Sequence, residues 1–166
     1  LKQRGCQDIH MKILGGGPLK EELEELADTL GGNVEFVGYA PYEKMAAYLK
    51  KSDILVNSFV KKAPQSIVTK IGDYLAAGKP MINTCSSPEF RKKVEADGFG
   101  MNIEAEDKLI LADAILELYQ DEPRRKRMGE KARKIAEEQF DRPNSYERIA
   151  ELMETLMQEN ERHDGV

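Results

Sequence analysis

Short apolar runs alternate with amphipathic stretches along the first two thirds of the chain. The apolar runs are typical of buried strands and lie at residues 9–14, 34–37, 53–57, 81–82 and 100–103. Between them, apolar residues recur every three or four positions, which predicts helices. This alternation predicts βαβ units with right-handed crossovers, and therefore an α/β fold with a doubly wound parallel sheet.

The helices are marked by their faces and ends. One face of the first is made of leucines, which we expect to point inward: Leu19, Leu23, Leu26 and Leu30. Ser66 is a candidate N-cap for a helix that runs to Ala77 and ends at Gly78. Another helix is expected over 86–97. The C-terminal third reads as helices over 107–120, 123–139 and 143–160.

Composition narrows the class of protein. The 166 residues carry a formal charge of −5, which argues against a general nucleic-acid binder. Two cysteines, Cys6 and Cys85, cannot form a disulfide framework, so we expect a cytoplasmic protein. No cluster has metal-ligand spacing. We expect one domain over 1–160, a frayed tail over 161–166 and, because the chain opens without methionine, a fragment of a longer protein.

Ligands of open α/β sheets bind at the carboxyl ends of the strands, where three segments are candidates. The first is the turn Gly15-Gly16-Gly17-Pro18. Its glycines would let a ligand approach the backbone, although a tight strand-to-helix turn explains them equally well. The spacing is not G-x-G-x-x-G, because Lys20 takes the third glycine position.

The second segment is the loop and helix start from Asn57 to Ile71. If the helix begins at Ser66, the free amides of Ile67, Val68 and Thr69 are suited to a phosphate, with Lys70 beside them. The third candidate is Asp73, which flanks the expected buried face of this helix. Its carboxylate could accept hydrogen bonds from paired sugar hydroxyls.

The order of these motifs resembles the nucleotide-binding half of a GT-B glycosyltransferase. The resemblance rests on Gly15-x-Gly17-Pro18, Val34-x-Phe36-x-Gly38, Asp53–Ser58 and, most specifically for the retaining group 1 (family 4) branch, Ser66–Pro80. It covers nearly the whole chain. It is closest to enzymes of bacterial capsule or O-antigen assembly.

This resemblance implies a donor site for a nucleotide-diphosphate sugar, with no metal and no other cofactor. Two family glutamates with seven residues between them fall here on Gln65 and Asp73, implying contacts to the donor sugar and to the ribose. Gln65 lacks the charge of the family residue. The implied nucleotide contacts are Gly15, Gly17, Val37, Gly38, Tyr39, Asn57, Ser58, Ser66, Ile67, Val68, Thr69 and Lys70.

The implied partners are the nucleotide sugar and an acceptor-binding N-terminal domain of the parent chain. The basic run Arg124–Arg127 is typical of a solvated helix face. Contact with the inner face of the membrane is an alternative, since enzymes of this family often glycosylate lipid-linked acceptors. We interpret Tyr39, Tyr42 and Tyr48 as packing residues, and Cys85 likewise.

Two alternative functions stay open: a nucleotide-sugar epimerase of the same architecture, and a non-catalytic module that binds a nucleotide or docks a partner. The family's central first strand and its helix are expected to be absent from this chain. The strands at 9–14 and 53–57 would then pair directly or leave an open position, which another copy could fill in a homodimer.

Overall fold

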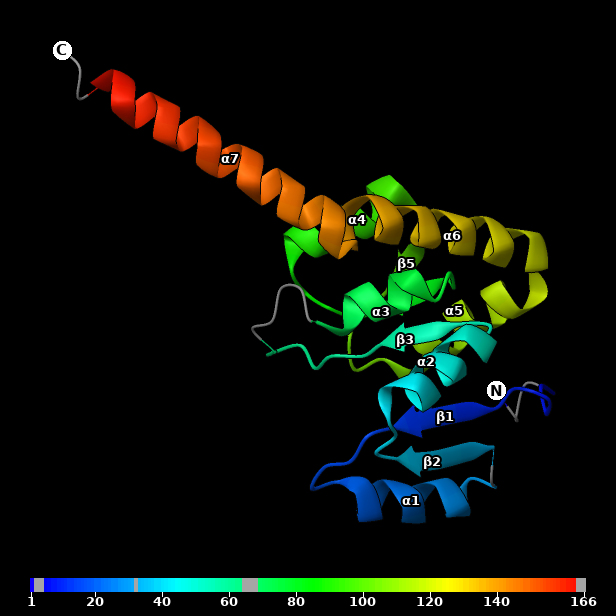
Figure 1. The fold of residues 1–166 in the computed structure, drawn as a ribbon. Coiled ribbons are helices and arrows are strands. Elements are labelled where there is room, and N and C mark those ends of the chain that lie inside the picture. Colours follow the sequence, from blue (N-terminus) through cyan, green and yellow to red (C-terminus); the bar gives the residue numbers. More distant parts are fainter. Residues whose placement is uncertain (2–4, 32, 64–68, 164–166) are drawn as a thin grey trace.

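The computed structural model describes residues 1, 5–31, 33–63 and 69–163. Strands and helices alternate along the chain, followed by a helical C-terminal third (Figure 1). The strands are β1 (Met11–Leu14), β2 (Val34–Gly38), β3 (Leu55–Asn57), β4 (Met81–Asn83) and β5 (Gly100–Asn102). The helices are α1 (Lys20–Thr29), α2 (Tyr42–Lys51), α3 (Lys70–Ala76), α4 (Pro88–Asp97), α5 (Lys108–Gln120), α6 (Glu122–Ile135), the π-helical turn η2 (Ala136–Phe140) and α7 (Arg142–His163).

Every strand pair is parallel, as predicted, but the described strands form two sheets. One sheet has the order β1-β2 and the other β3-β4-β5. The strands β1 and β3 run in the same direction in Figure 1, yet they do not pair with each other in this part of the chain. Of the two arrangements expected at this position, the structure therefore has the one in which the strands stay apart.

The core occupies both faces of the β3-β4-β5 sheet, as in a doubly wound fold. One cluster, the main core cluster, joins Met81 to α3, α4 and α6 and includes Ile71, Leu75, Phe90, Val94 and Ala132. The second lies on the opposite face, where Ile82 packs with Ala114 and Leu118 of α5. Because neighbouring residues of a strand point to opposite faces, Met81 and Ile82 serve different clusters.

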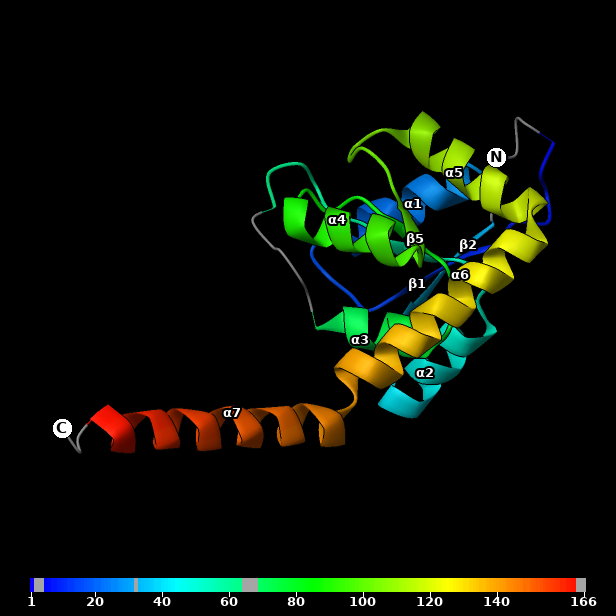
Figure 2. The ribbon, with the colours of Figure 1, turned by 90° about the horizontal axis from the view of Figure 1, so that it is seen from above.

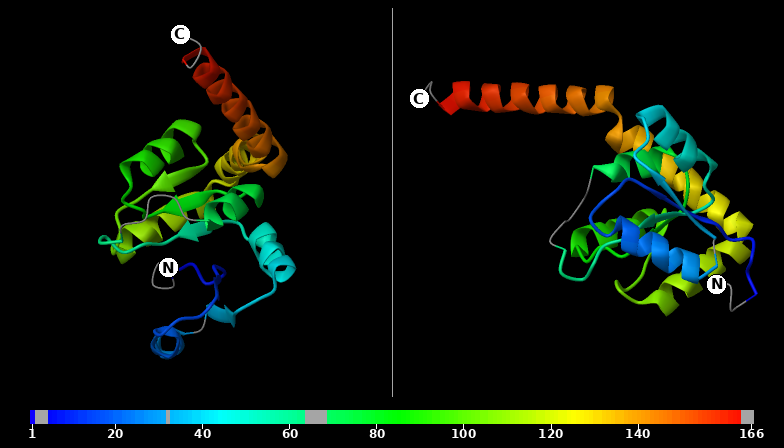
Figure 3. Two further views of the ribbon diagram at one scale, coloured as in Figure 1. Left: turned by 60° about the vertical axis from the view of Figure 1, so that its left-hand side comes forward. Right: turned by 90° about the horizontal axis from the view of Figure 1, so that it is seen from below.

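The region around β1 and β2 is packed very differently. Among the described residues before Pro41, only Ala27 is buried. The prediction that the leucines of the first helix point inward is wrong, because they are 41–66% exposed: Leu19, Leu23, Leu26 and Leu30. Figure 3 shows α1 at the outer side of the two-stranded sheet. A sheet of two strands offers too little surface to cover an amphipathic helix.

Helix α3 is held firmly at its C-terminal end. Gly78 follows it with a left-handed φ of +67°, as the glycine in the sequence predicts. A Cβ on Gly129 of α6 would lie 2.3 Å from the Gly78 carbonyl oxygen, so only glycine permits this approach. Arg133 also donates from Nη1 to the carbonyl oxygen of Ala76 (2.9 Å). Helix α6 thereby seats α3 against the sheet.

The C-terminal helices depart from two expectations. Arg125, in the basic run, donates to the carbonyl oxygens of Leu118 and Tyr119 and so caps the end of α5 rather than facing only solvent. Helix α7 extends away from the body in Figures 1 and 2. It is helical to His163, within the segment 161–166 expected to fray. No helix of the described residues is long and apolar enough to span a bilayer.

Candidate functional site

The turns after β1 and β2 lie against each other. The Gly15 amide donates to the Gly38 carbonyl oxygen (2.8 Å), and both glycines have left-handed φ angles, +105° and +73°. The exposed ring of Tyr39 lies so close to Gly16 that a Cβ there would be 2.9 Å from it. Gly17 faces open space. The structure thus brings the predicted residues Gly15, Gly17, Val37, Gly38 and Tyr39 into one place.

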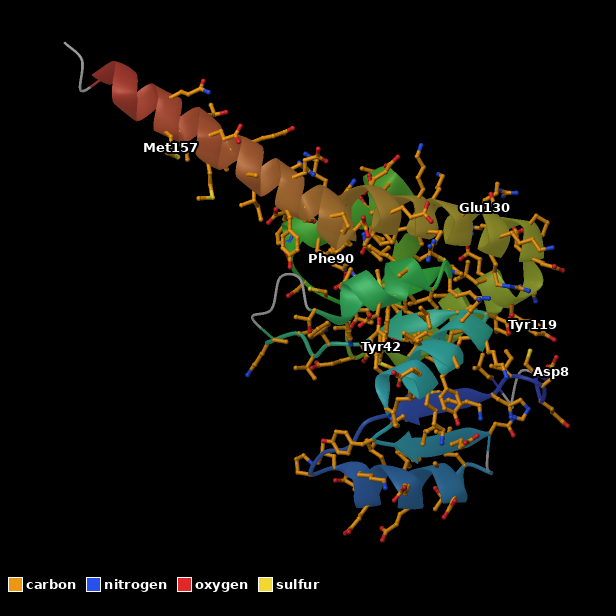
Figure 4. All side chains as sticks on the ribbon, in the orientation of Figure 1. Asp8, Tyr42, Phe90, Tyr119, Glu130 and Met157 are labelled. Atoms are coloured by element: carbon orange, nitrogen blue, oxygen red, sulfur yellow. The ribbon has the colours of Figure 1, made fainter. Side chains whose placement is uncertain are left out.

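A hydrogen bond connects α2 to the predicted ribose ligand in α3. Tyr42, at the start of α2, donates from its hydroxyl to Oδ1 of Asp73 (3.1 Å). Tyr42 is 65% exposed, so its interpretation as a packing residue is wrong. The other oxygen of Asp73 accepts no hydrogen bond from the described residues. Figure 4 shows Tyr42 between α2 and α3.

The groove beside this pair has a volume of about 820 Å³ and runs along the solvent side of α3 between α2 and α6. Tyr42, Met45 and Asp73 line part of it. Small residues of α3 and α6, including Ala76, Ala77 and Gly129, line it as well. Asp73 is therefore reachable from solvent, although it belongs to a helix whose other face is core.

The carboxyl ends of β3, β4 and β5 carry a ladder of asparagines. Asn57 donates from Nδ2 to Asn83 Oδ1 (2.8 Å), and Asn83 donates to Asn102 Oδ1 (2.9 Å). Asn57 and Asn83 are buried, so these bonds lock the strand ends in register. The predicted ligand Asn57 is thus chiefly structural in its contacts, although its buried Oδ1 has no hydrogen-bond partner among the described residues. Ser58, the next residue, is exposed.

Lys70 is the first residue of α3 and is half-buried. Its ammonium lies 5.2 Å from the centre of the Phe59 ring and 5.6 Å from that of Tyr74. Burial lowers the pKa of Lys70 and raises that of Tyr74. Lys70 forms no ion pair with any described residue. The arrangement is a desolvated cation between two aromatic faces, which can attract an anion.

Four predicted site residues lie outside the described residues: Gln65, Ser66, Ile67 and Val68. The predicted start of the helix at Ser66 lies there too; in the described part, α3 begins at Lys70 and Thr69 precedes it without a side-chain cap. Thr69 is exposed. The diphosphate contacts expected of this segment therefore stay predictions.

Sequence reasoning missed three residues of this region: Tyr42, Phe59 and Thr84. Tyr42 has no sequence signal for this role, because its contact with Asp73 joins two helices. Phe59 and Thr84 have no motif of their own, because their role depends on the contact between two loops. Cys85 is 2% exposed in the main core cluster, so its interpretation as a packing residue is confirmed.

A family model described as "Glycosyl transferases group 1" matches residues 1–121. A curated relative, the uncharacterized glycosyltransferase MJ1069 of Methanocaldococcus jannaschii, is 26% identical over 153 residues. That match covers 91% of this chain and 38% of the relative. The chain therefore spans about two fifths of the relative's length.

Solved structures show the same fold. Anabaena Alr3699/HepE in complex with UDP superposes with a TM-score of 0.77 at 19% identity, over 90% of this chain and 42% of that one. The same protein with UDP-glucose gives 0.74 at 20% identity, with the same coverage. Sucrose-phosphate synthase of Thermosynechococcus elongatus gives 0.75 at 19% identity, over 94% of this chain and 40% of that one. The expected Rossmann-like half of a GT-B fold is confirmed.

Proposed function

The chain belongs to the group 1 glycosyltransferases, and we propose that it is the donor-binding domain of one. The complete enzyme would move a sugar from a nucleotide-diphosphate sugar to a glycan or lipid-linked acceptor. Retention of configuration at the transferred carbon is part of this proposal. The observation that carries it is the pairing of Tyr42 with Asp73, which connects the start of α2 to α3.

In this proposal the nucleotide lies across the carboxyl ends of both sheets. The base lies beside Val37, Gly38 and Tyr39, and the ribose reaches Asp73. The second oxygen of Asp73, which accepts no hydrogen bond from the described residues, supports this assignment, because a carboxylate with one oxygen held by Tyr42 can still accept hydrogen bonds from the ribose diol. The complexes of HepE with UDP and UDP-glucose make UDP the first nucleotide to test.

The diphosphate in this proposal is bound by Lys70 together with the amides of Ile67, Val68 and Thr69. A cation close to the leaving phosphate stabilises negative charge that grows as the bond to the sugar breaks, so it lowers the barrier. Gln65 could hydrogen-bond the donor sugar but could not stabilise positive charge on it. We therefore propose that the enzyme stabilises the negative charge on the leaving diphosphate, and that it does so without a metal.

The test is calorimetric titration of the 166-residue chain with UDP, in the natural chain and in Asp73→Asn. Loss of the carboxylate should weaken UDP binding roughly 10- to 150-fold, the range for a hydrogen bond to a charged group. The matched control is Glu43→Gln, which removes the same charge from an exposed position next to Tyr42 and should leave the affinity nearly unchanged. Equal affinities of the natural chain and Asp73→Asn would exclude Asp73 from the site.

We further propose that the 166-residue chain binds the nucleotide without catalysing transfer. It spans about two fifths of the length of its relatives, and in this proposal the acceptor is bound elsewhere in the enzyme. The assay is release of UDP from UDP-glucose with a glycan acceptor present. Turnover by this chain alone would contradict the assignment of donor binding only.

A further inference from the structure

The aromatic cage around Lys70 comes from two separate elements. Tyr74 lies one turn after Lys70 in α3, so helix geometry alone places their side chains together. Phe59 comes from the loop after β3 and packs partly into the main core cluster. The position of the Lys70 ammonium between the rings therefore depends on how the loop holds Phe59.

A single hydroxyl holds both polar groups of the Phe59 backbone. The Phe59 amide donates to Thr84 Oγ1 (2.6 Å), and Thr84 Oγ1 is 3.0 Å from the Phe59 carbonyl oxygen, to which it can donate. The Thr84 amide donates to the Asn57 carbonyl oxygen (3.1 Å). Thr84 thus extends the contact between β3 and β4 by two residues beyond the end of the strand pairing at Asn57 and Asn83.

The chemistry of Thr84 points to an indirect role. Its side chain is 7% exposed and its hydroxyl is already engaged by Phe59, so it is not available to a ligand. Without the hydroxyl, the Phe59 amide would lose this partner, and the loop would keep only the backbone hydrogen bond from the Thr84 amide to Asn57. Serine would preserve both hydrogen bonds, whereas valine, which has the shape of threonine, would remove them.

We propose that Thr84 and Phe59 are positioning residues for Lys70: Thr84 fixes the Phe59 backbone, and the Phe59 ring, with Tyr74, holds the Lys70 ammonium where it meets the donor diphosphate. This inference rests on the proposed function, because it concerns the phosphate end of that site. In this inference, Thr84 and Phe59 do not touch the nucleotide. They hold in place the Lys70 ammonium, which does.

The experiment compares the binding of UDP and of uridine by NMR titration in Thr84→Val, Thr84→Ser and Lys70→Gln. Lys70→Gln should weaken UDP binding about ten- to hundredfold. Thr84→Val should weaken it about three- to tenfold, and Thr84→Ser should restore the natural affinity. Uridine has no phosphate, so its affinity should be the same in all of these variants.

A double variant separates positioning from general damage. In the Lys70→Gln background, Thr84→Val should cause no further loss of UDP affinity, because the group that it positions is gone. If Thr84→Val unfolds the chain, Phe59→Leu replaces it, since leucine keeps the apolar contact but removes the ring. Phe59→Leu should weaken UDP binding and spare uridine in the same way.

Three results would overturn the inference. One is an equal loss of UDP and uridine binding in Thr84→Val. The second is an undiminished loss in the Lys70→Gln background. The third is an unchanged UDP affinity in Lys70→Gln while the natural chain binds UDP. A natural chain that binds neither UDP nor uridine would instead overturn the proposed function, and the inference with it.

Discussion

The helices beside the two sheets carry similar apolar patterns, but they differ in how far their apolar residues are buried. Helix α4 buries Phe90 and Val94 completely against the β3-β4-β5 sheet, whereas α1 leaves its two leucines, Leu23 and Leu26, 41% and 51% exposed beside β1 and β2. An apolar stripe therefore identifies which face of a helix favours burial. Whether that face is buried depends on how many paired strands the neighbouring sheet offers to cover it.

Few of the contacts among the described residues connect the β1-β2 region with the β3-β4-β5 region. Asp8 accepts a hydrogen bond from the hydroxyl of Tyr119 (2.5 Å), and the Lys12 ammonium lies 5.8 Å from the centre of the Tyr48 ring. The proposed nucleotide site draws on both regions, since Val37–Tyr39 follow β2 and Lys70 and Asp73 belong to α3. In the proposed site, the nucleotide therefore bridges a closely packed region and a loosely packed one.

The largest expected effect contrasts the two helices directly. Phe90→Ala should destabilise the fold by about 3–5 kcal/mol, because it opens a cavity beside Phe99 in the main core cluster. Leu26→Ala in α1 should change stability by less than about 0.5 kcal/mol, because Leu26 is 51% exposed. Urea unfolding of both variants measures the difference. Equal losses would show that α1 is buried in solution.

All five strands could be predicted from the sequence, because each apolar run is short and ends at turn residues. The end of α3 at Gly78 was also predictable, since glycine there takes a left-handed φ. The exposure of the α1 leucines was not, because it depends on β1 and β3 not pairing. Asp73 could be named from its motif, but its partner Tyr42 could not, because that contact joins two helices.

The second contrast uses two glycines. Gly129→Ala should destabilise the fold by roughly 1–3 kcal/mol, because its Cβ would lie 2.3 Å from the Gly78 backbone oxygen and push α6 from α3. Gly17→Ala should leave the melting temperature unchanged, because Gly17 faces open space. If Gly17 contacts the donor as expected, the same variant should still lower UDP affinity. If Gly129→Ala were as stable as the natural chain, the close packing of α6 against the end of α3 would be contradicted.

The third contrast concerns association. Within the described residues, β1 and β3 each have one edge without a partner strand. These edges and the exposed Leu23 and Leu26 of α1 favour pairing with a second copy. We predict a homodimer through this region, which Leu23→Lys with Leu26→Lys should convert to a monomer. Sedimentation velocity measures the change. A natural chain that is monomeric at all concentrations would rule out this dimer.

The smallest expected effect is a pH dependence confined to the closely packed region. UDP is expected to bind the ammonium form of Lys70, so its affinity is complete below the pKa of Lys70 and is lost as the pH rises through it. Burial lowers this pKa, so the loss should begin at a lower pH than for an exposed lysine. Burial raises the pKa of Tyr74, so its phenol loses its proton at a higher pH than an exposed tyrosine does.

Calorimetry from pH 7.5 to about 10 covers the window in which an ordinary lysine begins to lose its proton. The control is Lys70→Arg, which stays charged and should show no loss of affinity with pH. An equal decline in both proteins would assign the pH dependence to another group.

The most direct test of the bridge is amide hydrogen exchange of the chain with and without UDP. Without UDP, the amides of β1 and β2 should exchange much faster than those of β4, whose three residues are all buried. With saturating UDP, the amides of Val37, Gly38 and Tyr39 should slow together with those that follow β3. Protection confined to the β3-β4-β5 region, with β2 unchanged, would contradict a nucleotide site shared by the two regions.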